Sequence, residues 1–142
     1  MPIINKHNPN IKLIVSGNKS LPFKNKSLIN IGFVSKKIFF KYLKGASLFV
    51  NPMQITFGVQ TKTLHALALG KTIIATKQGV AGIKINPSFN NIHIANNNNF
   101  YKQILNNINK SKINKSASKY YSSIYSMKKI VNDFLHKKKL LV

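Results

Sequence analysis

The feature that most constrains the fold of this chain is an alternation of short apolar runs with amphipathic segments. The apolar runs are bounded by Gly, Pro, Asn or Ser, as buried strands are. The expected strands are Ile11–Ser16, Leu28–Val34, Ser47–Val50, Lys71–Thr76 and Asn91–Ala95. Between and after them, apolar residues at helical spacing predict helices over Lys36–Lys44 (capped by Ser35), Val59–Leu69 and Phe100–Ile108. Strands that alternate with helices favour an α/β fold, a Rossmann-like doubly wound parallel sheet of about five strands.

The same patterning suggests how the chain is organised. Residues 1–110 read as one Rossmann-like domain, and residues 111–118, rich in Lys and Ser, read as a linker. A Lys-rich C-terminal helix is expected within 119–142, from about Lys119 to Lys139. No run approaches the roughly 18 apolar residues of a membrane span, and the N-terminus has no apolar signal-peptide core. A cytoplasmic location is therefore expected.

The charge is extreme and excludes several chemistries. The chain has 23 Lys, no Arg, Glu or Cys, and one acidic residue, Asp133, for a formal net charge of +22. Catalysis by a pair of carboxylates and a carboxylate-built calcium or magnesium site both need more acidic residues than this. Cysteine nucleophiles and thiolate zinc sites are also excluded. The four histidines show no metal-ligand spacing. We expect no metal, and the sequence assigns no catalytic side chain.

The positive charge has two possible origins. It is typical of proteins that bind nucleic acid or an anionic membrane surface. It also matches drift towards A/T-rich codons, because Lys, Asn and Ile together make up 61 of 142 residues (23, 19 and 19). The lysines are scattered, and no Arg is present for bidentate phosphate contacts, which favours drift. Either origin predicts non-specific binding to polyanions at low salt.

The segment Ala46–Thr76 is the most informative part of the sequence. It reads as a strand, a loop, a Gly at a helix start, an amphipathic helix and a second strand. Gly58 allows a ligand to approach the backbone, and the first N–H groups of the helix favour an anion such as a diphosphate. A plain helix–strand connection with a packing glycine fits the residues equally well.

The same segment resembles a known family. Its matching residues are Val50–Pro52, Thr56–Gly58, Leu64–Ala68, Gly70 and Ile73–Thr76. They are similar to the C-terminal, donor-binding domain of retaining glycosyltransferases with the two-domain GT-B fold, in glycosyltransferase family 4 (glycosyl transferases group 1). The resemblance covers about Asn8 to Asn109 and is strongest from Ala46 to Ile83.

The resemblance implies a donor-binding site. We expect that site to contain no metal and no other cofactor. Phe33 and Val34 would border the nucleotide base. The backbone N–H groups of Phe57, Gly58 and Val59 would bind the donor diphosphate. The ligand implied is a nucleotide-sugar.

Two further positions follow from the resemblance. Lys62 would add charge to the diphosphate site, although an exposed solvating lysine is an equal reading. Leu64 and His65 occupy the ribose position, where the family has a Glu that accepts hydrogen bonds from two hydroxyls. A neutral imidazole has one acceptor nitrogen and cannot replace that carboxylate. The second Glu of the family signature falls at Phe57.

The resemblance also implies what the chain does. It would be the donor-binding half of a retaining glycosyltransferase, N-terminally truncated, which transfers a sugar from a nucleotide-activated donor to an acceptor. Because the acceptor domain of the family is missing, the chain holds at most half of a site. It is then either a fragment of a decayed enzyme or a half that needs a separate acceptor-domain chain, and a peripheral position at the inner membrane surface is compatible with both. The alternative is a basic, ribosome-associated protein that binds nucleic acid.

Overall fold

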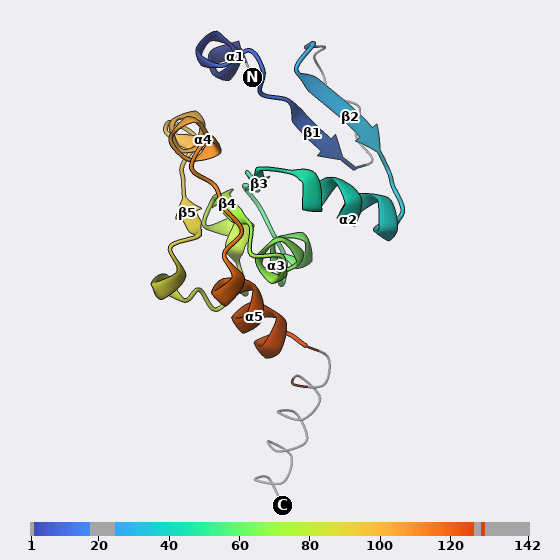
Figure 1. Ribbon diagram of the computed structural model, residues 1–142, viewed down its shortest axis with the longest axis vertical. Coiled ribbons are helices and arrows are strands. Elements are labelled where there is room, and N and C mark those ends of the chain that lie inside the picture. Colours follow the sequence, from blue (N-terminus) through green and yellow to red (C-terminus); the bar gives the residue numbers. More distant parts are fainter. Residues whose placement is uncertain (1, 18–24, 127–128, 130–142) are drawn as a thin grey trace, which may run out of the picture.

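A computed structural model describes residues 2–17, 25–126 and 129 of the chain (Figure 1). The helices are α1 (Pro2–His7), α2 (Lys36–Gly45), α3 (Thr61–Ala68), α4 (Phe100–Ile108) and α5 (Lys115–Ile124). The strands are β1 (Leu13–Ser16), β2 (Leu28–Gly32), β3 (Leu48–Asn51), β4 (Thr72–Ala75) and β5 (Ile92–Ile94). Two short 3-10 turns, η1 (Gln78–Val80) and η2 (Pro87–Phe89), lie between β4 and β5. All five predicted strands are therefore present.

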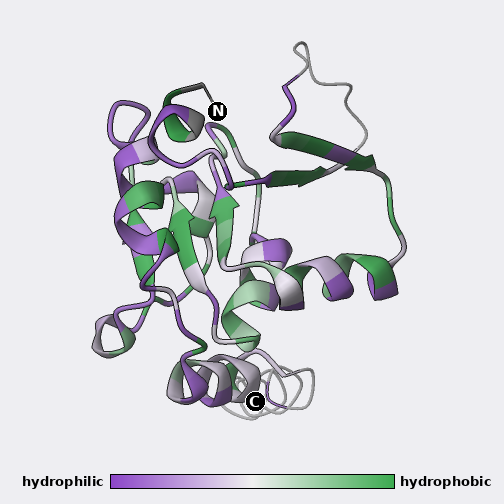
Figure 2. Ribbon diagram, turned by 45° about the horizontal axis from the view of Figure 1, so that its top comes forward, coloured by the Kyte–Doolittle hydropathy of each residue, from purple (hydrophilic) through white to green (hydrophobic). Residues whose placement is uncertain are grey.

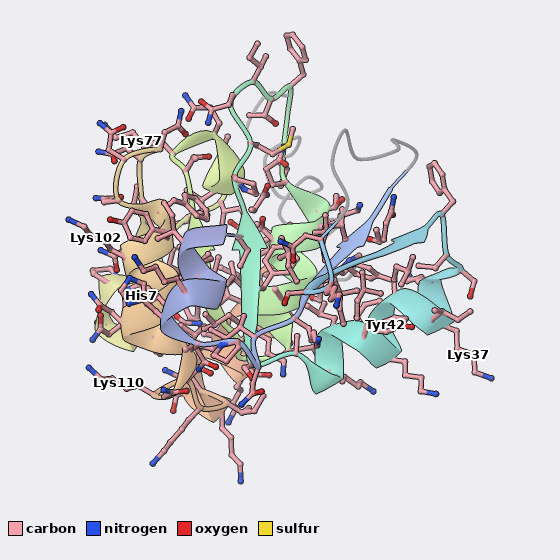
Figure 3. All side chains as sticks on the ribbon, turned by 90° about the horizontal axis from the view of Figure 1, so that it is seen from above. His7, Lys37, Tyr42, Lys77, Lys102 and Lys110 are labelled. Atoms are coloured by element: carbon pink, nitrogen blue, oxygen red, sulfur yellow. The ribbon has the colours of Figure 1, made fainter. Side chains whose placement is uncertain are left out.

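The strands form two parallel sheets. One has the order β1-β2 and the other the order β3-β4-β5, and every strand pair in both is parallel. This confirms a Rossmann-like α/β fold, but the strands do not join into one sheet. In Figures 1 and 3, β1 lies between β2 and β3. No strand in the described part of the chain pairs with the edge of β1 that faces away from β2.

The core is centred on β4. Its residues Ile73, Ile74 and Ala75 are fully buried, and β3 and β5 pair with the two edges of β4. The continuous β-branched run in the sequence is what a strand covered on both faces requires. The helices α3 and α5 add Leu67 and Tyr121 to the same core. Figure 2 shows β1 and β2 to be hydrophobic too, although they stand apart from this centre.

Capping residues explain where α2 begins and how its end is held. The predicted cap, Ser35, is confirmed: its Oγ accepts a hydrogen bond from the N–H of Ile38 at 3.4 Å. At the other end, Lys71 is buried, and its Nζ donates to the carbonyl oxygens of Lys44 and Ala46, both at 2.7 Å. A cation at the negative end of the helix satisfies carbonyls that would otherwise lack partners. Lys71 thus ties α2 to the start of β4.

Two helices differ from expectation. Helix α1 was not predicted, since its six residues form fewer than two turns and have mixed polarity. The last helix begins at Lys115 and not at Lys119, because Asn114 caps it: the Asn114 Oδ1 accepts from the N–H of Ala117 at 2.9 Å. The first residues of α5 therefore come from the segment expected to be a linker. The C-terminal part of the predicted helix, in 127–128 and 130–142, lies outside the described residues.

Candidate functional site

A buried polar network joins the loops that follow β3 and β4. Asn51, the last residue of β3, donates from Nδ2 to the Oγ1 of Thr63 at 2.9 Å and to the carbonyl oxygen of Gly79 at 3.1 Å. The Thr63 hydroxyl donates in turn to the same Gly79 oxygen at 2.8 Å. Because Asn51 and Thr63 are both buried, these bonds are shielded from water. The network fixes both loops against the first turn of α3.

Thr76 extends the network from the end of β4. Its Oγ1 accepts from the N–H of Gly79 at 3.0 Å and donates to the carbonyl oxygen of Met53. Gly79 itself has no room for a side chain, since a Cβ there would lie 2.4 Å from the backbone oxygen of Asn51. The close contact between the two loops therefore requires glycine at position 79.

Gly58 lies in the loop after β3, three residues before α3, and not at the first position of the helix. Its φ is +74°, which favours glycine, and a Cβ there would meet nothing within 4 Å. The helix was expected from Val59 to Leu69 but spans Thr61–Ala68. It starts late because the N–H of Gln60 donates to the carbonyl oxygen of Ala81 at 3.4 Å and holds Gln60 outside the helix.

The backbone around the start of α3 presents a series of free donors. Within the described residues, the N–H groups of Phe57, Gly58 and Val59, and those of Thr61, Lys62 and Thr63, donate no hydrogen bond. The N-cap residue, Gln60, makes no capping bond with its side chain. Free N–H groups at a helix start, together with the helix dipole, attract anions.

The side chains of the loop 52–60 point in different directions. The Phe57 side chain is 95% exposed and that of Ile55 is 73% exposed. Val59 instead packs on Gly82, where a Cβ would approach the Val59 Cγ2 to 2.8 Å. The loop therefore rests on Gly82 through Val59 while its tip is in solvent.

Lys62 and His65 share the face of α3 that contacts α2. The Lys62 Nζ lies 5.9 Å from the ring centroid of Phe39. The His65 ring lies 4.9 Å from that of Phe40 and 6.2 Å from that of Phe39, centroid to centroid. Leu64 packs against the hydrophobic core. Two of the predicted site residues, Lys62 and His65, are thus neighbours beside an aromatic pair, and Leu64 is a packing residue.

The imidazole of His65 is poorly satisfied. Its Nδ1 is buried and has no hydrogen-bond partner in the described part of the chain. Burial, and secondly the positive charge of Lys36, lower the pKa of His65 below its usual value of 6.5. The ring is therefore neutral at pH 7 and offers at most one acceptor nitrogen.

Phe33 and Val34 follow β2, on the other sheet. Phe33 is 80% exposed, and Val34 is partly buried. The turn before them is set by Gly32, whose φ is +63° and whose N–H donates to the Oδ1 of Asn30 at 3.0 Å. The two residues predicted to border the base thus lie at the carboxyl end of a sheet different from the one that leads to Gly58.

The residues that hold the site together were not singled out from the sequence. Asn51, Thr63, Thr76 and Gly79 form the network. Asn51 and Thr76 lie in the segments that resemble the family, but the sequence pattern assigned no role to either side chain. A usable signal does exist, because Asn51 and Thr76 are the polar residues that end two apolar strand runs. The carboxyl ends of parallel strands are where such folds place ligands.

Among the described residues, no three His, Cys, Asp or Glu side chains gather to form a metal site. No helix in the same part of the chain is both long and apolar enough to cross a membrane.

Comparison with protein families gives a match to this chain. The family model described as "Glycosyl transferases group 1" matches residues 1–110, which include both sheets and the loops of the polar network. No curated protein and no solved structure matches the chain.

Proposed function

Because the chain belongs to the group 1 glycosyl transferases, we propose that it binds the diphosphate of a nucleotide-sugar donor at the start of α3. The observation that carries the proposal is the set of free N–H groups on both sides of Gln60. Six such groups lie in residues 57–59 and 61–63, on a backbone that the Asn51 network holds in place. A diphosphate would satisfy several of them at once.

The charges around this backbone favour an anion. The described residues contain no Asp or Glu, since Asp133 is the only acidic residue of the chain. Lys62 lies in the first turn of α3, where its ammonium group would add attraction for the phosphates. Because phosphate attraction at exposed lysines is screened by salt, this part of the binding should weaken as ionic strength rises.

His65 limits how well the rest of the donor is bound. Its ring packs beside Phe39 and Phe40 and carries no charge at pH 7, so it does not provide the two strong acceptors that ribose hydroxyls need. Donor binding by this chain would therefore depend mainly on the diphosphate. We expect a dissociation constant for a nucleoside diphosphate well above about 1 µM.

In the proposed reaction, the chain stabilises the departing diphosphate while the sugar passes to an acceptor with retention of configuration. No side chain at the site is assigned a proton-transfer or nucleophilic role, and no metal is invoked. The acceptor would be held outside residues 1–142, so we expect no turnover by these residues alone.

Two glycine variants test the diphosphate site by calorimetric titration with UDP and with inorganic pyrophosphate. Gly58→Ala forces an L-residue into φ near +74°, at a strain of about 1–2 kcal/mol. We expect it to weaken both ligands by roughly tenfold. Gly45→Ala is the matched control, because Gly45 ends α2 and a Cβ there meets nothing within 4 Å. Equal affinities in the two variants would reject the site.

A third variant tests the ribose position. His65→Glu should restore a preference for UDP over pyrophosphate, because charged hydrogen bonds contribute about 1.5–3 kcal/mol each. The salt-sensitive component of binding should hardly change. If the wild-type chain already prefers UDP strongly and His65→Glu leaves that preference unchanged, the ribose does not lie at position 65.

A dedicated nucleic-acid interface is the second candidate, and the placement of the lysines argues against it. In Figure 3, Lys77, Lys102 and Lys110 point outward on the left side of the molecule, and Lys37 points outward on the opposite side. Nucleic-acid-binding domains gather such charges on one face or along one helix. Non-specific binding to polyanions at low salt remains a prediction from the net charge of +22.

A further inference from the structure

The two sheets together have the strand arrangement of a doubly wound fold with its central position empty. Such folds commonly have the order 3-2-1-4-5-6, in which the first strand lies in the middle. Here β2-β1 forms one side and β3-β4-β5 the other, and β1 lies next to β3 in Figures 1 and 3. The described residues provide no strand between them.

The free edge of β1 can be identified from its hydrogen bonds. The N–H of Leu13 donates to Ser27 at 2.8 Å, and that of Gly17 donates to Gly32 at 2.9 Å, so both point to the β2 side. Backbone groups alternate in direction along a strand. The N–H and C=O groups of Ile14 and Ser16 therefore point away from β2, where no partner is present among the described residues.

The free edge of β3 also follows from its hydrogen bonds. The carbonyl oxygen of Asn51 accepts from the N–H of Thr76 at 3.2 Å and so points to β4. By alternation, the backbone groups of Leu48 and Val50 point to the opposite side. In the described part of the chain, they have no hydrogen-bond partner there. Two open edges thus face the same empty position, and both belong to sheets in which every strand pair is parallel.

The strands on both sides of this position contain apolar residues. Ile14 and Ile29, which are partners in the β1–β2 register, are 40% and 41% exposed. Next to the free edge of β3, Leu48, Phe49 and Val50 are partly buried. A central strand in a parallel sheet is covered on both faces and is therefore an apolar, β-branched run.

We propose that an extended apolar segment of a polypeptide with a different sequence binds between β1 and β3, parallel to both, and joins the two sheets into one. Its central four or so residues would match the length of the two flanking strands, which are four residues each. Acidic residues beside that run would complement a chain whose described part has no carboxylate side chain. This inference does not depend on the donor site.

The test uses a blocked synthetic peptide with four alternating valines and isoleucines and two glutamates at each end. Amide hydrogen exchange is measured by NMR on the whole chain, with and without the peptide. We expect exchange at Ile14, Ser16, Leu48 and Val50 to slow by at least about tenfold on binding. The amides of Leu13 and Thr76, already bonded within their sheets, should change by a smaller factor.

Two controls separate strand pairing from apolar adsorption. A peptide with the same residues but methylated at alternate backbone nitrogens keeps the side chains and loses half of its donors, so it should bind at least about tenfold more weakly. In the protein, Ile14→Pro removes the N–H that points to the empty position and should therefore weaken peptide binding. An edge strand tolerates proline at such a position. Ile14→Ala keeps that N–H and should retain peptide binding.

Equal binding of the two peptides would overturn the proposal, as would peptide binding without slower exchange at the four amides. Protection of these amides in the chain alone, rising with protein concentration, would also overturn it, because a second copy would then cover the edges. If Ile14→Pro fails to fold, the methylated peptide and the exchange data still decide the question. A loss of UDP binding by Gly58→Ala would not affect this outcome.

Discussion

The two sheets contain similar residues but differ in what surrounds them. In the three-stranded sheet, Ile73 and Ile74 of β4 are fully buried. In the two-stranded sheet, Ile14 and Ile29 lie opposite each other, and each is about 40% exposed. The strands of both sheets are parallel and apolar, so composition does not explain the difference.

The difference lies in the number of neighbours. The strand β4 has a paired strand on each edge, and the hydrophobic cluster around it includes residues of α2, α3 and α5. The pair β1–β2 has an open edge and an exposed apolar face, and two strands alone are marginal in water. We therefore expect most of the stability to come from the three-stranded half.

The largest expected effect comes from a matched pair of isoleucines. Ile74→Ala removes buried atoms from β4 and should lower the free energy of unfolding by about 2–5 kcal/mol. Ile14→Ala, in the exposed position on β1, should cost about 1 kcal/mol or less. Urea denaturation of both variants measures the difference. Similar losses in the two variants would show that both sheets contribute equally to stability.

A second comparison uses helix caps. Asn114 caps α5 and also donates from Nδ2 to the carbonyl oxygen of Phe89 at 2.9 Å, so Asn114→Ala should cost about 1–3 kcal/mol. Ser35 caps α2, which follows the two-stranded sheet, through a single long bond of 3.4 Å. Ser35→Ala should cost only about 0.5 kcal/mol. Thermal unfolding by circular dichroism can rank the two, and a larger effect at Ser35 would contradict the comparison.

The smallest effect concerns pH. Burial lowers the pKa values of His65 and His93, both in the three-stranded half, and Lys36 lowers that of His65 further. Below about pH 6.5 the unfolded chain therefore binds more protons than the folded chain, and stability falls as pH decreases through 6.5 towards the folded pKa values. The slope is at most about 1.4 kcal/mol per pH unit for each histidine.

Urea denaturation at pH 7.5, 6.5 and 5.5 measures this slope. The double variant His65→Gln, His93→Gln should flatten it, whereas His7→Gln serves as a control in α1, outside both sheets. An unchanged slope in the double variant would place the titrating group elsewhere in the chain.

Local structure was largely predictable from the sequence, because it depends on neighbouring residues. The β-branched run around Ile73 predicted β4, and the hydroxyl of Ser35 before an amphipathic segment predicted the start of α2. The motif around Gly58 pointed to the family that the match over 1–110 shows. Boundaries were less accurate where a distant residue sets them, as Ala81 does for Gln60 at the start of α3.

The sequence by itself therefore determined the parallel α/β class, the family and the segments that form strands, since hydrophobic period and turn chemistry act over a few residues. Tertiary structure alone decided that the five strands divide into two sheets, because each strand's neighbours depend on pairing between segments far apart. It also decided that Asn51, Thr63 and Gly79 meet, although they span 28 positions. Likewise, only packing against α2 put the His65 ring beside two aromatic rings, where burial keeps it neutral.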